Sequence, residues 1–272
     1  RDEKMSQFNL DQSKCNSCGS CVSNCPLGHV EMINNYPQTI PETACSSCGH
    51  CEAGCSEGAI DISGPNLEPP LVNTSSEISP EDMGNYMRNR RSIRNYKKNA
   101  IARETIEEVM DIVRFAPSGV NQQPINWIII EDPEKVKVLA GLCIQWMEEL
   151  VESNSPLAQI LPMESLIKVS KTGSDPILRG APHVFIATAQ DNQGSAVTDG
   201  VISLSHLELA LPSFDLGSCW AGFLKMASDF KPIREFLGLK ENELFIGALM
   251  VGYPDCKFYR VPKREKLSVK YI

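Results

Sequence analysis

The chain reads Cys15-Asn-Ser-Cys18-Gly-Ser-Cys21-Val-Ser-Asn-Cys25, and later Cys45-Ser-Ser-Cys48-Gly-His-Cys51-Glu-Ala-Gly-Cys55. Both stretches follow the pattern C-x2-C-x2-C-x3-C, and a glycine follows the second cysteine in each. Three thiolates so close together on a tight turn can bind three corners of one iron–sulfur cube, whereas the fourth lies too far along the chain to close it comfortably. The repeated quartet therefore predicts two [4Fe–4S] clusters.

A disulfide scaffold and a zinc site are the alternative interpretations of these cysteines. Disulfides are typical of small exported domains, and the sequence shows no signal peptide. Structural zinc is usually bound by two ligand pairs that a longer loop separates, not by a run of four cysteines. The spacing favours iron and sulfide. The other three cysteines (Cys143, Cys219 and Cys256) are predicted to be small buried apolar residues.

Residues 8–63 resemble a bacterial two-cluster ferredoxin. In that family the fourth cysteine of each quartet binds the other cluster. The resemblance implies one cluster on Cys15, Cys18, Cys21 and Cys55, and a second on Cys45, Cys48, Cys51 and Cys25. The second quartet departs from the family where Ser56 stands in place of the proline that follows the first quartet.

The composition changes after the quartets, which indicates two domains. We expect a ferredoxin-type domain over residues 1–63, a proline-rich linker over 64–78 and a larger domain over 79–272. Ser79-Pro80-Glu81-Asp82 is a strong helix start. Further helices are predicted over Glu104–Phe115, Pro133–Ser153 and Ala196–Phe214, and strands over Trp127–Ile130, His183–Ala189 and Leu244–Gly252. This pattern predicts an α/β or α+β fold.

Two polar segments of the larger domain are candidates for binding an anion and a heterocycle. Arg90-Arg91-Ser92-Ile93-Arg94 is either a solvated helix end or a phosphate clamp, since guanidinium groups and a hydroxyl match phosphate oxygens. Ala116-Pro117-Ser118-Gly119-Val120-Asn121-Gln122-Gln123-Pro124 is a turn-rich loop whose amides can bind the polar edge of a ring.

These two segments together resemble the FMN-dependent nitroreductase family. Leu216-Gly217-Ser218-Cys219-Trp220-Ala221-Gly222 matches a loop beside the flavin ring in that family. Val251-Gly252-Tyr253-Pro254, followed by the basic run Tyr259-Arg260-Val261-Pro262-Lys263-Arg264, matches its C-terminal signature. The resemblance covers about residues 80–268. It implies a nitroreductase-like α+β domain with a mixed sheet surrounded by helices, and an intertwined homodimer with FMN at its interface.

The resemblance also implies roles for single residues. Arg90, Arg91, Ser92 and Arg94 are expected at the FMN phosphate and ribityl chain, with a further phosphate contact from Arg260, Lys263 or Arg264. Asn121 and Gln123 are expected at the pyrimidine edge, and Pro117, Ser118 and Gly119 at the flavin of the partner subunit. Cys219, Trp220, Ala221 and Gly222 are expected beside flavin N5 and O4. No catalytic acid or base is assigned, because the flavin itself supplies the redox chemistry.

The implied activity is that of a flavin-dependent oxidoreductase. Electrons from a ferredoxin or another redox protein would pass through both clusters to FMN and reduce a nitroaromatic, a quinone or a similar electron-poor organic molecule. NAD(P)H is an alternative donor. An electron carrier or redox sensor without a substrate of its own, and a reductive dehalogenase of the same fold, are alternative functions. Residues 150–180 are expected to cap the active site.

Charge and hydropathy narrow the expected partners. The formal net charge of −8 argues against nucleic-acid binding, which requires a basic face. Residues 1–62 hold eight acidic residues against three basic ones, which suits docking on a basic redox partner. No apolar run approaches the roughly 20 residues that span a bilayer. We therefore expect a cytoplasmic protein that does not enter the membrane.

Overall fold

The computed structural model describes residues 7–63 and 77–272, and the contacts of the chain divide it into two units. The first unit is Arg1–Glu77 with Ser118–Gln122, and the second is Ile78–Pro117 with Gln123–Ile272. Most of the expected linker falls on residues 64–76, outside the described residues, so the boundaries drawn from the sequence remain predictions. Within the described ranges, no helix has both the length and the apolar character needed to cross a membrane.

The first unit is built as two similar halves. Its strands are β1 (Gln7–Leu10), β2 (Val30–Ile33), β3 (Tyr36–Thr39) and β4 (Ile60–Ser63), and its helices are α1 (Ser20–Ser23) and α2 (His50–Ala53). Strand β1 pairs antiparallel with β4, and β2 with β3. Asn34 and Asn35 form the two-residue turn of the β2–β3 hairpin with φ of 50° and 69°. Asparagine tolerates this left-handed region, which matches the twist of a hairpin.

The cysteine repeat is a repeat of the backbone as well. Gly19 and Gly49 precede α1 and α2 with φ of 75° and 70°, a conformation that glycine adopts without steric penalty. A small cluster of buried side chains, Cys21, Val30 and Ile60, lies between the halves. The sequence repeat therefore folds as two equivalent loop–helix elements.

The second unit is built around a four-stranded sheet in the order β5-β6-β8-β7. Its strands are β5 (Asn126–Ile130), β6 (His183–Gln190), β7 (Gly217–Trp220) and β8 (Glu243–Gly252). Neighbouring strands pair antiparallel. An isolated bridge from Ser92 to Ser218 runs parallel and lies beside β7, so both pairing senses occur around the sheet.

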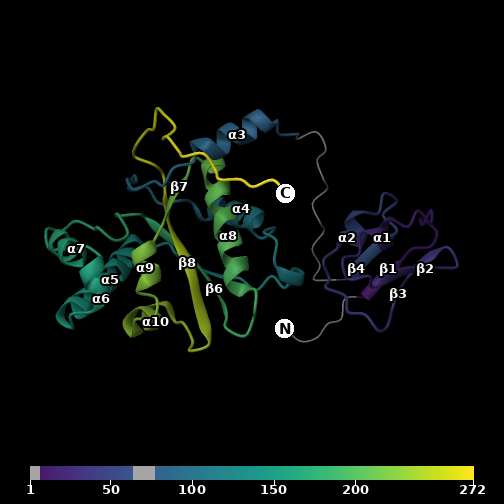
Figure 1. Ribbon diagram of the computed structural model, residues 1–272, viewed down its shortest axis with the longest axis horizontal. Helices are drawn as coiled ribbons and strands as arrows, with labels where there is room; N and C mark the ends of the chain where they lie inside the picture. Colours follow the sequence, from purple (N-terminus) through teal and green to yellow (C-terminus); the bar gives the residue numbers. More distant parts are fainter. Residues whose placement is uncertain (1–6, 64–76) are drawn as a thin grey trace. The chain divides into compact units, whose positions relative to one another are not determined.

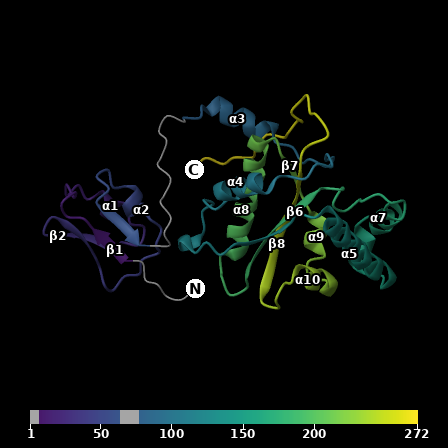
Figure 2. The same cartoon turned by 180° about the vertical axis from the view of Figure 1, so that it is seen from behind.

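Helices cover both faces of this sheet, and each face has its own hydrophobic cluster (Figure 1). The helices of the second unit are α3 (Pro80–Asn89), α4 (Arg103–Val113), α5 (Pro133–Glu152), α6 (Pro156–Ile160), α7 (Met163–Ser170), α8 (Ala196–Ala210), α9 (Gly222–Met226) and α10 (Lys231–Leu237). Helices α4 and α8 pack on one face, and α5, α9 and α10 on the other, as the reverse view also shows (Figure 2). The described residues also form two 3-10 turns, η1 (Gly119–Asn121), which lies in the segment grouped with the first unit, and η2 (Leu211–Phe214) in the second.

A β-bulge in the central strand decides which side chains face which layer. Gly247 pairs with Ala187 and Phe245 with Thr188, so Ile246 is an extra residue in β8. Phe245 and Ala248 both pack in the α5 layer, although they are an odd number of residues apart, and Ile246 packs in the α8 layer. The extra residue shifts the two-residue alternation of the strand by one position.

The segment that was expected to cap the active site contributes to the core. Met163 and Ile167 of α7, together with Ile177 and Leu178 farther along, are buried in the cluster beneath α5. Its role as a cap remains a prediction. Of the three scattered cysteines, Cys143 and Cys219 are buried as expected, whereas Cys256 is half-buried.

Candidate functional site

The first cysteine cavity draws on both halves of the first unit. Cys15, Cys18 and Cys21 line it from the loop before α1, and Cys55 lines it from the loop after α2. The open space within the whole lining, part of it continuous with solvent, is about 330 Å³. The fourth cysteine of the second quartet therefore lies beside the first three cysteines of the first quartet.

The second cavity has the reciprocal arrangement. Cys45, Cys48 and Cys51 line it from the loop before α2, and Cys25 from the loop after α1, around about 370 Å³. Phe8 and Ile62 of the β1–β4 pair close this cavity, just as Met32 and Pro37 of the β2–β3 hairpin close the first. Both linings combine three thiols from one half with one thiol from the other.

Backbone amides point at the two crossing thiols. His29 N donates to Cys25 Sγ at 3.1 Å, and Ala59 N donates to Cys55 Sγ at 3.2 Å. Such bonds stabilise a thiolate ligand and tune the potential of an iron–sulfur cluster. Burial raises the pKa of Cys21, and it raises the pKa of Cys51 to about 11. A bound metal must therefore displace protons from these thiols.

The cysteines surround a volume and do not converge on a point. Within residues 7–63 and 77–272, no three His, Cys, Asp or Glu side chains meet as they would around a single metal ion. Four thiols that line one cavity, with an amide donor to one of the sulfur atoms, fit the ligand set of a [4Fe–4S] cluster.

The Arg90–Arg94 segment is joined to β7 in the second unit. Ser92 forms the parallel bridge to Ser218, and Ile93 N donates to Ser218 O at 2.8 Å. These bonds bring the predicted phosphate clamp beside the predicted flavin loop, which folds as strand β7 although it reads as a loop in the sequence. Ile93 is buried and Arg94 is exposed.

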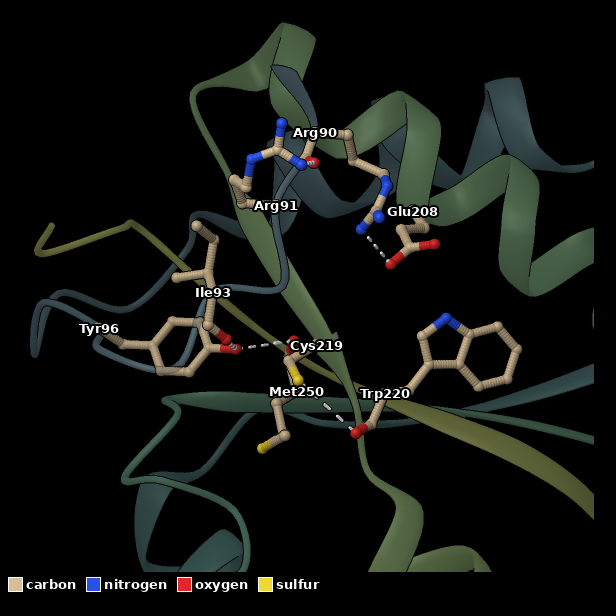
Figure 3. Close-up of polar contacts among 8 residues, drawn as sticks. All are labelled: Arg90, Arg91, Ile93, Tyr96, Glu208, Cys219, Trp220 and Met250. Carbon is tan, nitrogen blue, oxygen red and sulfur yellow. Dashed lines mark hydrogen bonds and ion pairs between the residues drawn. The ribbon is translucent and has the colours of Figure 1, made fainter. Parts of the chain in front are cut away.

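Two arginines of this segment form hydrogen bonds or an ion pair with residues of the same unit (Figure 3). Arg90 Nη1 lies 2.9 Å from Glu208 Oε1 on α8, and both side chains are largely buried. Arg91 donates to the carbonyl oxygens of Arg90 and Arg88. Sequence reasoning did not identify Glu208. The sequence feature that could have pointed to Glu208 is a single acidic residue within the apolar run Leu207-Glu208-Leu209-Ala210-Leu211.

Cys219 and Trp220 face opposite sides of β7 (Figure 3). The Cys219 thiol is buried near Tyr96. The Tyr96 hydroxyl donates to Ile93 O at 2.6 Å, and burial raises the pKa of Tyr96. The Trp220 indole lies toward Glu208 and is 37% exposed. Gly247 makes room for this ring, because a Cβ there would lie 3.2 Å from Trp220 Cζ3. A partly exposed aromatic side chain can pack against a planar ring.

Residues 117–123, which include η1, have a strained backbone. Val120, Asn121 and Gln123 have φ of 43°, 56° and 46°, a region that residues other than glycine seldom occupy. The contacts of Ser118–Gln122 group this segment with the first unit, whereas Pro117 and Gln123 belong to the second. Their expected contacts with a flavin remain predictions.

The C-terminal basic residues lie beyond the last strand. Asp255 N donates to Asn95 O at 2.9 Å, which ties the start of this segment to the residues after Arg94. Arg260, Lys263 and Arg264 are exposed on the irregular chain that follows. The structure places Arg90, Arg91, Ser92, Arg94 and Cys219–Gly222 around β7, and it shows these three cations on the solvent-exposed end of the same unit.

Comparison with known proteins matches both parts of the chain. Residues 87–253 match the model of the nitroreductase family, and residues 14–60 match the 4Fe-4S dicluster domain. A candidate NADH dehydrogenase/NAD(P)H nitroreductase of Archaeoglobus fulgidus is 30% identical over 177 residues, which cover 64% of this chain and 88% of that protein. An iodotyrosine deiodinase of Thermotoga neapolitana is 24% identical over 67% of this chain and 93% of that protein.

Among solved structures, a Bacteroides fragilis nitroreductase with bound FMN superimposes with a TM-score of 0.55. It is 20% identical, and the match covers 70% of this chain and 97% of that one. This likeness shows a shared fold. Together with the family match over most of the larger unit, it leads to one conclusion: the chain belongs to the nitroreductase family and carries a 4Fe-4S dicluster ferredoxin domain ahead of its nitroreductase domain.

Proposed function

We propose that this protein is an FMN- and iron–sulfur-dependent oxidoreductase. In this proposal a redox protein supplies electrons through two [4Fe–4S] clusters to FMN, which reduces a nitroaromatic, a quinone or a similar electron-poor molecule. The observation that carries the proposal is the pair of cysteine cavities, each lined by three thiols of one quartet and the fourth thiol of the other.

In the first unit, the cysteines bind the clusters and the surrounding chain tunes them. Cys15, Cys18, Cys21 and Cys55 hold one cluster, and Cys45, Cys48, Cys51 and Cys25 hold the other. The bound clusters accept and release single electrons. The amides of His29 and Ala59 stabilise negative charge on the crossing sulfur atoms.

In the second unit, charged and polar residues hold FMN. Arg90, Arg91, Ser92 and Arg94 bind the phosphate and ribityl chain, because guanidinium forks and a hydroxyl match phosphate oxygens. Cys219–Gly222 pass beside the reactive edge of the ring, where backbone N–H groups stabilise developing charge. Bound FMN supplies transfer of a hydride or of single electrons.

The remaining contacts to the flavin come from residues on irregular segments. Asn121 and Gln123 bind the pyrimidine edge, and Arg260, Lys263 or Arg264 adds a phosphate contact. Pro117, Ser118 and Gly119 reach the flavin of a second copy, so the active form is an intertwined homodimer. The Bacteroides fragilis nitroreductase of the same fold has bound FMN, which supports FMN as the cofactor in this proposal.

Reductive dehalogenation is a second candidate reaction. The observation that favours it is the similarity to the iodotyrosine deiodinase of Thermotoga neapolitana over 93% of that protein. Both reactions would use the same flavin and the same electron supply, and they differ in the group that is reduced. Assays of this protein should therefore include a halogenated phenol among the tested substrates.

Cofactor content and reduction kinetics test the proposal. Anaerobically purified protein should contain about eight irons per chain, matching sulfide, and one FMN. In stopped-flow experiments, reduced ferredoxin should bleach the flavin quickly. A flavin that NADPH reduces quickly and ferredoxin does not would refute the electron path, and bound zinc in place of iron would refute the cluster assignment. Failure to turn over any nitroaromatic, quinone or halogenated phenol would favour an electron carrier.

A further inference from the structure

The two cysteine cavities differ in charge at equivalent positions of the repeat. We propose that Glu57 sets the cluster held by Cys15, Cys18, Cys21 and Cys55 at a lower reduction potential than the cluster of the second cavity. One electron added to the first unit by a low-potential donor protein then resides on the second cluster. This inference rests on the proposed function, since both cavities must hold a [4Fe–4S] cluster.

Hydrogen bonds hold the Glu57 carboxylate against the first quartet. Glu57 lines the first cavity. Its Oε1 accepts from Asn16 Nδ2 at 3.3 Å and from Ser56 Oγ at 3.0 Å. Asn16 Oδ1 in turn accepts from Cys18 N at 3.1 Å. A chain of bonds therefore links the carboxylate to the loop that carries three of the cysteines.

The equivalent positions of the second cavity cannot form this network. Leu27 lines the second cavity where Glu57 lines the first, and Pro26 stands where the other half has Ser56. Gly28 and Gly58, which follow Leu27 and Glu57, have nearly the same φ of 60° and 57°. The two halves thus share a backbone while one cavity has a carboxylate and the other an isobutyl group.

Among the other features of the cavities, one acts in the same direction as Glu57: Ser47 N donates to Cys45 Sγ of the second cavity at 3.4 Å, and such a bond stabilises a reduced cluster. The Glu57 variants separate the two contributions, because they leave this bond in place. The amide bonds to Cys25 Sγ and Cys55 Sγ are equivalent. His29 and His50 line the second cavity, and neither can carry a negative charge. Glu52 is a carboxylate near the second quartet that could offset the effect of Glu57, because its Oε2 would lie 4.0 Å from a Cβ on Gly49. Its side chain is not among the residues that line the second cavity.

The sign of the effect follows from charge. Reduction of a cluster by one electron adds one negative charge, and cluster potentials depend on nearby charge and on exposure. A carboxylate at the first cavity makes that charge less favourable there. When the first cluster gives its electron to the second, one cluster is oxidised and the other reduced by the same electron. Glu57 is exposed, so salt screens its effect.

Charge variants with matched controls test the inference. The full-length protein is reconstituted anaerobically and reduced stepwise, and the two cluster couples are followed by low-temperature EPR at low and at high salt. Glu57→Gln keeps an acceptor for Asn16 and Ser56 but removes the charge. We expect it to move the lower couple to a less negative potential, with a larger shift at low salt.

The symmetry-related control is Leu27→Glu, which should move the higher couple to a more negative potential. The double variant Leu27→Glu/Glu57→Leu should reverse the order of the couples. If Glu57→Gln moves neither couple, or moves the higher one, the inference is wrong. If the unmodified protein binds fewer than two clusters by iron analysis, the proposed function has failed instead, and the two failures are thereby distinguished.

Discussion

Gly217 of β7 packs closely against the Arg90–Arg94 segment. A Cβ at this position would overlap Ile93 Cγ1 and would lie 3.0 Å from Pro254 Cγ. Gly217→Ala must therefore push the two segments apart. We expect it to lower the free energy of unfolding of the second unit by about 1–3 kcal/mol and to weaken FMN binding. Denaturant unfolding followed by tryptophan fluorescence measures the first effect, since Trp127, Trp146 and Trp220 are the three tryptophans of the chain.

Gly141 provides the matched control. It is an exposed residue within α5, and no atom lies within 4 Å of a Cβ built on it. Gly141→Ala should raise the free energy of unfolding by up to about 1 kcal/mol, because alanine has the higher helix propensity. Equal losses in both variants would contradict the close-approach argument at Gly217.

His183 gives the second unit a predictable dependence on pH. The side chain is buried, its Nε2 accepts from Ile101 N at 2.8 Å, and burial lowers its pKa. Below about pH 6.5, His183 therefore binds a proton in the unfolded chain more readily than in the folded chain. Stability is lost as the pH falls through this value, by no more than about 1.3 kcal/mol between pH 7.5 and 5.5, which is the limit for a histidine that stays neutral in the folded chain.

His183→Gln separates this contribution from those of other groups. Glutamine offers an oxygen to the same amide and does not titrate in this range. The variant should lose less stability than the unmodified protein over the same interval in denaturant unfolding. An unchanged pH dependence would rule out His183 as its source.

At the scale of elements, helix α3 depends on its cap. Ser79 Oγ accepts from Asp82 N at 3.0 Å, and α3 has no buried residue between Pro80 and Asn89. Ser79→Ala should destabilise the helix by about 1 kcal/mol, which corresponds to about fivefold faster amide exchange within it. Hydrogen exchange by mass spectrometry measures this. Exchange in α5, which has its own cap at Asp132, serves as the internal reference.

Helices with strong local signals could be predicted from the sequence. The expected helices over 104–115 and 133–153 agree with α4 and α5 to within one or two residues at each end. The helix expected over 196–214 ends as α8 at Ala210, and a 3-10 turn follows. Pro212 explains the change, because it lacks the N–H that a continuing α-helix requires.

Elements that depend on distant partners could not be predicted. Strand β7 has four residues and exists because Cys219 pairs with Met250 of β8 and Ser218 with Ser92. The role of Glu208 likewise depends on Arg90, which lies 118 residues away in sequence. The cysteine quartets could be found from spacing alone, because they are a local pattern. The Arg90–Arg94 segment is also local, but its residues alone fit either a solvated helix end or a phosphate clamp, and the second interpretation came from the family resemblance.

At the scale of the whole molecule, the two units should differ in their dependence on metal. The first unit has a very small buried cluster, and domains of this size often need a metal or disulfides to fold. Removing iron under anaerobic conditions with a strong chelator should increase hydrogen exchange throughout residues 7–63. The second unit, with two large hydrophobic clusters, should keep its exchange protection and its tryptophan fluorescence transition.

A cysteine variant provides the control for this experiment. Cys143→Ala changes a buried thiol that is not part of either cavity, so it should respond to the chelator as the unmodified protein does. If residues 7–63 stay protected after the iron has been removed, the clusters are not required for the fold of the first unit.

In each half, the fourth cysteine lines the cavity of the other half, and this arrangement has a consequence for how clusters would be inserted and lost. Since each cavity takes three thiols from one half and one from the other, neither half is a complete binding module. If both proposed clusters bind, insertion of the first would order both crossing loops and so prepare the site for the second, and we expect cooperative loading. By the same reasoning, oxidative loss of one cluster would release a cysteine loop that also holds the other, so we expect the two clusters to be lost together.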